Sequence, residues 1–289
     1  MVLIPKTQKA AQPNVMLLLM ISPICAPPMS THQIWRLIVS ESITLDLLKK
    51  LRLTGMESTL AARLNQARES SLSYEELLMM LFHDELESRQ QKSLFNRVKQ
   101  AHFEEPKSFD NFELSPYSTQ AKQAIHTLMT GKSIKEKNHV IIMGPVGTGK
   151  THLAQALGLL ACQRQKKVCF IRTNDLLHRF HQSRADETWA RLFKRYTKYD
   201  VLILDDFGLK TLSAEQSGDL YDLIAAMHIN SMLIFTSNRK IEGWMDVFYD
   251  PIMANAALDR IVNKAYRVVL DGESYRKKSI PKFNEESDK

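Results

Sequence analysis

Short apolar segments alternate with helical patterns over the second half of the chain. Apolar runs predict buried strands at 139–143, 168–171, 201–204, 232–235 and 267–270. The stretches between these runs carry apolar residues at helical spacing. Strands that alternate with helices typically form a parallel sheet with both faces covered. We therefore expect an α/β domain with a parallel five-stranded sheet over residues 108–276.

Residues 44–107 follow a helical pattern without strands. Leucines at 45, 48, 51 and 53 precede a break that we predict at Gly55-Met56, and a second helical stretch passes through 60 and 64. Ser73 and Glu76 have the spacing of a capping box, in which each side chain accepts a hydrogen bond from the other residue's backbone N–H. One face of the helix that follows carries Tyr74, Leu77, Leu78 and Leu81. We expect a small all-helical N-terminal domain over 44–107.

The two ends of the chain differ from these domains. An apolar run at 15–21 follows Lys6 and Lys9, which faintly resembles a signal peptide. The run is far shorter than the roughly 20 residues that span a membrane. We interpret 1–43 as a disordered or spurious extension and 277–289 as a flexible tail. The prediction is a cytoplasmic protein without a membrane partner.

Composition narrows the class of protein. Of 289 residues, 44% are hydrophobic and 25% are charged, which excludes a wholly disordered chain and a polytopic membrane protein. The net charge is +7, and residues 114–289 carry 26 bases against 19 acids, so the positive field belongs to the α/β part. Three cysteines without metal-ligand spacing indicate reduced thiols.

Residues 144–151 carry the strongest chemical signal. Their sequence, GPVGTGKT, matches the phosphate-binding loop G-x-x-x-x-G-K-[ST], with a predicted strand before it and a helix after it. Glycines let backbone N–H groups turn toward phosphates, Lys150 reaches the β- and γ-phosphates, and the Thr151 hydroxyl can ligate Mg²⁺. We predict that ATP is bound by Gly144, Pro145, Val146, Gly147, Thr148, Gly149, Lys150, Thr151 and His152.

Two further strands end in polar residues. The strand at 201–204 ends in Asp205 and Asp206; the first carboxylate can hold Mg²⁺, and the second can polarise a water for attack on the γ-phosphorus. The strand at 232–235 is followed by a turn that includes Asn238, which can orient the same water. We predict metal ligation by Thr151 and Asp205, and catalytic roles for Lys150, Asp206 and Asn238.

Two basic features leave alternatives open. Arg260 can act as an arginine finger in a neighbouring subunit's site, or it can form an ordinary ion pair on a helix surface. One helical face carries Arg191, Lys194, Arg195 and Lys198. We expect the other face, with Trp189, Leu192, Phe193 and Tyr196, to pack inward. That basic face suits sequence-independent contacts with DNA phosphates, but it also fits a solvated helix surface.

Together these motifs resemble the AAA+ ATPases, and more narrowly the IstB family of insertion-sequence helper ATPases, relatives of the DnaC-type helicase loaders. The resemblance covers about residues 44–276. It is carried by GPVGTGKTHLAQALG at 144–158, VLILDDFG at 201–208, FTSNR at 235–239, ALDRIVNKAYRV at 257–268, GESYR at 272–276, and the helical segments 48–64 and 71–85.

The resemblance implies an AAA+ P-loop NTPase core that uses ATP and Mg²⁺ and assembles into a homo-oligomer. Asp206 stands where many AAA+ proteins have Glu, Asn238 matches their sensor residue, and Arg260 matches the trans-acting finger. Duplex DNA and a cognate DDE transposase are the implied partners. The alternatives are a helicase-loading ATPase of DNA replication, a small-molecule kinase that uses the same loop, and a binding module that does not hydrolyse ATP.

Overall fold

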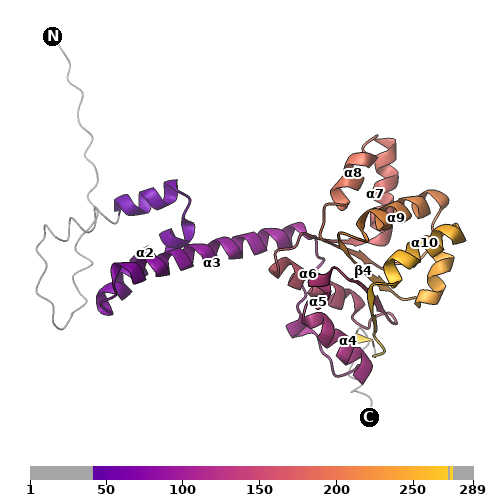
Figure 1. Cartoon of the computed structure of the whole chain (residues 1–289), viewed down its shortest axis with the longest axis horizontal. Coiled ribbons are helices and arrows are strands. Elements are labelled where there is room, and N and C mark those ends of the chain that lie inside the picture. The colour runs from indigo at the N-terminus through magenta and orange to yellow at the C-terminus, as the bar shows by residue number, and fades with distance from the viewer. Residues whose placement is uncertain (1–41, 273, 276–289) are drawn as a thin grey trace, which may run out of the picture. The chain divides into compact units, whose positions relative to one another are not determined.

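The computed structural model describes residues 42–272 and 274–275 (Figure 1). These residues divide into two compact units, which meet in the sequence between Glu87 and Ser88. Residues 1–41 of the predicted extension and the whole predicted tail at 277–289 lie outside the described residues. The predicted domain boundary after residue 107 stays a prediction. Within the described ranges, no helix combines the length and the hydropathy that crossing a membrane requires.

The first unit consists of a helix at 42–50, helix α2 (Thr54–Glu69) and the first part of α3 (Tyr74–Gln100). Our predicted break at Gly55-Met56 is wrong, because both residues lie in the first turn of α2. The reason is the buried Glu85 carboxylate, which accepts hydrogen bonds from the N–H groups of Gly55 at 2.7 Å and Met56 at 3.3 Å. These N–H groups lack partners inside the helix, so Glu85 fixes where it begins.

Helix α3 begins as predicted and then departs from the prediction. The capping box is present: Ser73 N–H donates to the Glu76 carboxylate at 2.7 Å, and Glu76 N–H donates to the Ser73 hydroxyl at 3.2 Å. Of the predicted apolar face, Leu81 is buried in a small core cluster with Met56 and Leu60, and Leu77 is half-buried against this cluster. Tyr74 and Leu78 remain 88% and 52% exposed. Only part of this face therefore enters the core of the first unit.

The second unit contains the predicted sheet. Its strands are β1 (His139–Met143), β2 (Val168–Arg172), β3 (Val201–Asp205), β4 (Met232–Ser237) and β5 (Ala265–Val269). All neighbours pair in parallel, in the order β2-β3-β4-β1-β5. The prediction of a parallel five-stranded sheet is confirmed. The last strand begins two residues earlier than predicted, because Ala265 pairs with His139 at the start of β1.

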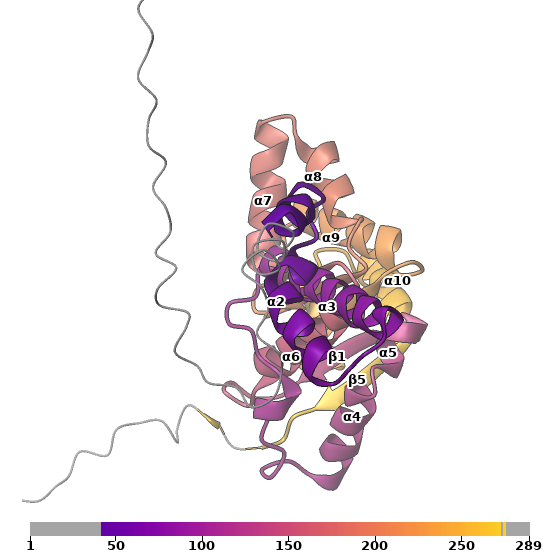
Figure 2. The same cartoon turned by 90° about the vertical axis from the view of Figure 1, so that its left-hand side faces the viewer.

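Helices cover both faces of this sheet (Figures 1 and 2). Along β1, Val140 and Ile142 enter one core cluster, whereas Ile141 and Met143 enter the other, as the alternation of side chains along a strand requires. The first cluster includes residues of α4 (Thr119–Met129), α5 (Lys132–Glu136) and α6 (Lys150–Gln163). The second is covered by α7 (Thr173–Ala185), α8 (Trp189–Tyr196), α9 (Ala214–Met227) and α10 (Pro251–Val262).

The unit also contains the 3₁₀ helices η2 (Phe109–Asn111) and η3 (Ile241–Val247). Both described cysteines, Cys162 and Cys169, are buried free thiols, as predicted. Cys25 lies outside the described residues. Because β1, β3 and β4 are neighbours in the sheet, the polar residues at their carboxyl ends meet at one edge, and the candidate site lies there.

Candidate functional site

The predicted phosphate-binding loop connects β1 to α6. Gly149 precedes the first residue of α6 and has φ +85°, a left-handed conformation that L side chains rarely adopt. Lys150 begins the helix, and its Nζ donates to the Pro145 carbonyl at 2.7 Å across the loop. The first N–H groups of α6 and the Lys150 ammonium group make this end of the helix electropositive, which favours binding of an anion.

Residues distant in the sequence hold the loop in place. The Tyr117 hydroxyl donates to the Thr148 carbonyl at 2.7 Å, and Tyr275 N–H donates to the Gly147 carbonyl at 2.9 Å. A Cβ at Gly144 would lie 2.3 Å from the Leu270 carbonyl oxygen, so only glycine fits there. The loop is therefore held on one side by the connector between α3 and α4 (101–118), which contains Tyr117, and on the other by residues that follow β5.

Asp205 ends β3 and is 2% exposed. The Thr151 hydroxyl lies 3.1 Å from both of its carboxylate oxygens, and the Thr236 hydroxyl donates to Oδ1 at 2.5 Å. Burial raises the pKa of this carboxyl above its ordinary value. A buried carboxylate beside a hydroxyl offers oxygen donors of the kind that Mg²⁺ prefers, so the residues present fit this ion.

Asp206 has a strained backbone. Its φ of +55° is left-handed, a conformation uncommon for a residue other than glycine and found mostly at sites where the surroundings enforce it. Its N–H donates to the Thr236 hydroxyl at 2.9 Å. Phe207 N–H donates to the Thr236 carbonyl at 2.8 Å, and the Ser237 hydroxyl donates to the Phe207 carbonyl at 2.8 Å. The end of β4 thus holds the turn after β3.

One cavity of about 730 Å³ joins these parts. The predicted residues that line it are Val146, Gly147, Gly149, Lys150, Thr151, His152, Asp205, Asp206 and Asn238. Gly144 and Pro145 line a neighbouring cavity of about 720 Å³, and Thr148, within the loop, is buried. Five acidic and three basic side chains line the first cavity, so a polyphosphate would enter it more readily together with a divalent cation.

His152 lines the cavity as an uncharged residue. Its Nε2 lies 3.1 Å from the Ser108 carbonyl oxygen, which can only accept, so Nε2 carries the proton. Burial lowers the pKa of this imidazole. The ring packs edge-to-face with the Phe112 ring, with centroids 5.1 Å apart. His152 therefore forms a neutral wall of the cavity.

Arg260 does not line the cavity with the other predicted catalytic residues. It lies on α10, where its Nη1 donates to the Ala256 carbonyl at 2.6 Å and its guanidinium carbon lies 5.1 Å from the centre of the Tyr221 ring. The residues that line its own chain's cavity do not include it. A role for Arg260 in phosphate chemistry would therefore have to be played in another subunit.

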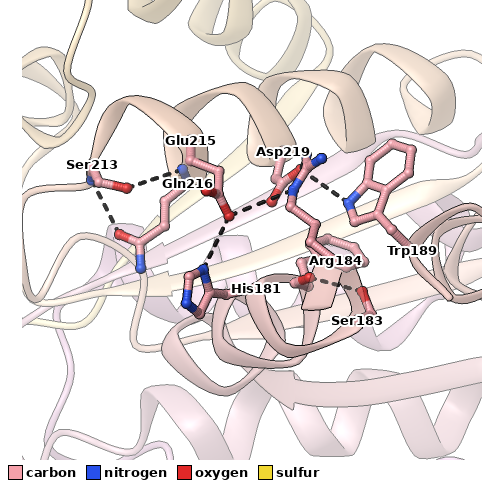
Figure 3. Close-up of polar contacts among 9 residues, drawn as sticks. His181, Ser183, Arg184, Trp189, Ser213, Glu215, Gln216 and Asp219 are labelled. Carbon is pink, nitrogen blue, oxygen red and sulfur yellow. Dashed lines mark hydrogen bonds and ion pairs between the residues drawn. The ribbon is translucent and has the colours of Figure 1, made fainter. Parts of the chain in front are cut away.

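The predicted basic face lies on α8 and the turn after it, and its four cationic residues are exposed. Tyr196 is buried, and Trp189, Leu192 and Phe193 are half-buried against the core, so the aromatic face packs inward as predicted. Figure 3 shows how the start of α8 is fixed: Trp189 Nε1 donates to the buried Asp219 carboxylate at 3.1 Å, and Arg184 pairs with the same carboxylate. His181 pairs with Glu215 of α9 beside it.

Sequence reasoning missed several residues of the site. Thr236 bridges both aspartates, and its position in the polar end of a strand was a signal that could have found it. Arg172, at the end of β2, lines the cavity and pairs with Glu104 of the connector. Nothing in the local pattern around Glu104 indicates this pairing, since the two residues meet only in the fold.

Comparisons with known proteins agree with this geometry. Residues 46–282 match the family described as IstB-like ATP binding protein. The chain is 37% identical to a protein named as an ATP-binding protein of an insertion sequence in Mycobacterium tuberculosis (strain ATCC 25618 / H37Rv), over 81% of this chain and 94% of that one. It is 31% identical to a similarly named protein of insertion sequence IS232 in Bacillus thuringiensis subsp. berliner, over 83% and 96%.

Among solved structures, the crystal structure of DnaI has a similar fold. Its TM-score is 0.51 at 22% identity, over 57% of this chain and 90% of that one. This likeness shows the fold alone and agrees with the parallel five-stranded sheet. The family match extends over most of the chain. The chain belongs to the IstB-like ATP-binding proteins.

Proposed function

We propose that this protein is a Mg²⁺-dependent ATPase that assembles on duplex DNA and assists the DDE transposase of its insertion sequence. The observation that carries the ATPase proposal is the meeting of Lys150, Thr151 and the Asp205-Asp206 pair around one cavity. The site combines cations for phosphate, oxygen donors for a metal, and a carboxylate next to both. This set of groups suits phosphoryl transfer to water.

Each residue has a distinct task in the proposed hydrolysis. Lys150 and the N–H groups of the loop hold the β- and γ-phosphates, and Asp205 with Thr151 would hold Mg²⁺, which offsets phosphate charge. Asp206 orients a water and accepts its proton while the water oxygen bonds to the γ-phosphorus. The bond from that phosphorus to the β–γ bridging oxygen breaks, which yields ADP and phosphate. Asn238 borders the same cavity and can orient the water.

The place of Arg260 supports the proposed assembly. Its guanidinium is held on α10 by Ala256 and Tyr221, outside its own chain's cavity. In the proposed assembly this arginine would contact the terminal phosphate of ATP in a neighbouring subunit and offset charge in the transition state. ATP bound between two subunits would then stabilise the homo-oligomer.

The basic face of α8 supports contact with DNA. Four exposed cations stand on a helix whose other face is anchored in the core by Trp189 and Tyr196. A rigid cationic face of this kind suits the regular phosphates of a duplex and does not read sequence. The names of the relatives place those proteins in insertion sequences, which supports a transposase as the client and the cytoplasm as the place of action.

Sedimentation of the full chain with DNA of about 50 nucleotides tests the proposal. Large complexes on duplex DNA with ATP, lost with ADP and weakened in Arg260→Ala, are the expected result. Preference for single strands would instead favour a helicase loader. Absence of DNA binding in every nucleotide state would refute the transposition role, and ATP turnover stimulated only by a small acceptor would indicate a kinase.

A further inference from the structure

Arg172 brings a second cation to the nucleotide cavity. It is the last residue of β2 and pairs in register with Asp205 of β3, so the two side chains leave the same face of the sheet. Helix α7 begins at the next residue, and the Thr173 hydroxyl donates to the Asp205 carbonyl at 2.9 Å. Arg172 therefore stands on a rigid strand end, and it lines the same cavity as Lys150.

Glu104 is held opposite Arg172 by the residues on either side of it. Phe170 N–H of β2 donates to the Ala101 carbonyl at 2.8 Å, and the Phe103 ring packs against the Phe170 ring with centroids 6.5 Å apart. Glu105 N–H donates to the side-chain oxygen of Gln155 at 3.4 Å. The connector is thus fixed along the edge strand. Glu104 Oε1 lies 2.5 Å from Arg172 Nη2.

The pair contributes little to folding stability. The Arg172 and Glu104 side chains are 54% and 45% exposed, and exposed ion pairs typically contribute about 0–1 kcal/mol. The pair instead fixes the direction of the Arg172 side chain, because Glu104 holds the end of this long and flexible chain at the mouth of the cavity. Glu104 foremost, and then Asp206, raise the pKa of Arg172, so its charge is permanent.

We propose that Arg172 contacts the terminal phosphate of ATP from the β2 side, and that Glu104 is the positioning residue that aims it. The inference rests on the proposed ATPase function. Lys150 approaches the phosphates from the β1 side, where α6 begins, whereas Arg172 approaches from the far side of the Asp205-Asp206 pair. A guanidinium presents paired N–H groups that match phosphate oxygens. Because only ATP carries a γ-phosphate, Arg172 would discriminate ATP from ADP.

Binding of ATP and ADP to the full chain in Mg²⁺ tests this assignment. A non-hydrolysable ATP analogue and ADP are titrated against wild type and Arg172→Ala. We expect affinity for the ATP analogue to fall about tenfold or more, as for the removal of a charge-assisted hydrogen bond, and affinity for ADP to change less than about twofold. Arg164→Ala is the matched control, since Arg164 lies at the opposite end of α6 and bonds the Gly131 carbonyl.

The positioning role of Glu104 is tested by coupling. As a single substitution, Glu104→Gln should lower kcat. Added to Arg172→Ala, it should lower kcat no further, because Glu104 acts through Arg172. An equal fall in affinity for both nucleotides in Arg172→Ala, or a fall for neither, would overturn the role of Arg172 while the ATPase proposal stands. A Glu104→Gln effect that persists without Arg172 would overturn the positioning role. Wild type that binds no ATP would overturn the proposed function itself.

Discussion

The hydroxyl of Thr236 donates a hydrogen bond of 2.5 Å to Oδ1 of Asp205. The oxygen of that hydroxyl accepts the N–H of Asp206 at 2.9 Å, so one side chain of β4 fixes both aspartates at the end of β3. Thr236 is fully buried, and its bond lowers the pKa of Asp205 against the opposing effect of burial. It therefore favours the ionised form of the proposed metal ligand and helps to hold Asp206 in its left-handed conformation.

Thr236→Val should slow ATP hydrolysis while leaving the fold intact. Valine has the shape of threonine, but it cannot donate to Asp205 or accept from Asp206. A hydrogen bond to a charged group is typically worth about 1.5–3 kcal/mol, so we expect kcat to fall about 10- to 100-fold. The pKa of Asp205 should rise, which moves the acid limb of the pH–rate profile to higher pH. Steady-state kinetics between pH 5 and 9 measure both effects.

Thr127→Val is the matched control, because the Thr127 hydroxyl bonds the Gln123 carbonyl of its own helix, α4, away from the cavity. It should leave kcat and the pH profile unchanged. A Thr236→Val enzyme with wild-type kcat and an unmoved acid limb would mean that the aspartates do not depend on this hydroxyl. A protein that loses its thermal transition would call for Thr236→Ser, which keeps the hydroxyl and should restore activity.

The parts of the site that could be predicted from the sequence are local. The loop at 144–151 and the Asp205-Asp206 pair each lie within a few consecutive residues, and their flanking strands are apolar enough to be identified. The polar end of the fourth strand points to Thr236, but its contacts with both aspartates depend on the register of β3 against β4, which the sequence does not show. Glu104 and Arg172 are 68 positions apart and meet only because the connector follows the edge strand. The same limitation explains the error at Gly55, whose partner Glu85 is 30 residues away.

Asp206→Asn should separate ATP binding from hydrolysis. Asparagine tolerates a left-handed backbone, so the turn at φ +55° is retained while the carboxylate that would accept the proton is removed. Loss of a general base typically costs about 100- to 10,000-fold in rate, whereas affinity for ATP should change little. Single-turnover hydrolysis and equilibrium binding measure the two quantities. Retained turnover together with retained binding would remove Asp206 from the mechanism.

Removing the basic face of α8 should weaken binding to any duplex by the same factor. Each DNA phosphate that the variant no longer neutralises should reduce the slope of log K against log salt by about 0.9. Lys194→Ala combined with Lys198→Ala removes two exposed charges and leaves the inward aromatic face intact. Fluorescence anisotropy across a range of salt concentrations, with two unrelated duplexes, measures the slopes. Lys132→Ala with Lys135→Ala, on α5 at the other face of the sheet, is the control; equal changes in both double variants would refute a specific role for α8.

His139 should make the stability of the sheet unit depend on pH. It is fully buried in β1, where its Nδ1 accepts the Leu233 N–H at 3.1 Å, and burial foremost lowers its pKa from 6.5 to about 4. In the unfolded chain His139 binds a proton below about pH 6.5, whereas in the folded chain it does so only near pH 4. The stability that the neutral imidazole contributes is therefore fully present above pH 6.5 and is lost as the pH falls toward 4. Between about pH 7.5 and 5.0 the decrease amounts to about 2 kcal/mol.

Urea unfolding at about pH 7.5 and 5.0, followed by intrinsic tryptophan fluorescence to which the buried Trp244 contributes, measures this dependence. His139→Asn keeps an acceptor for the Leu233 N–H but cannot be protonated in this range. It should therefore lose about 2 kcal/mol less stability than wild type over the same pH interval. His126→Asn, which alters an exposed imidazole on α4, should behave as wild type. If His139→Asn and wild type lose equal stability, the neutral imidazole is not what makes the folded sheet sensitive to acid.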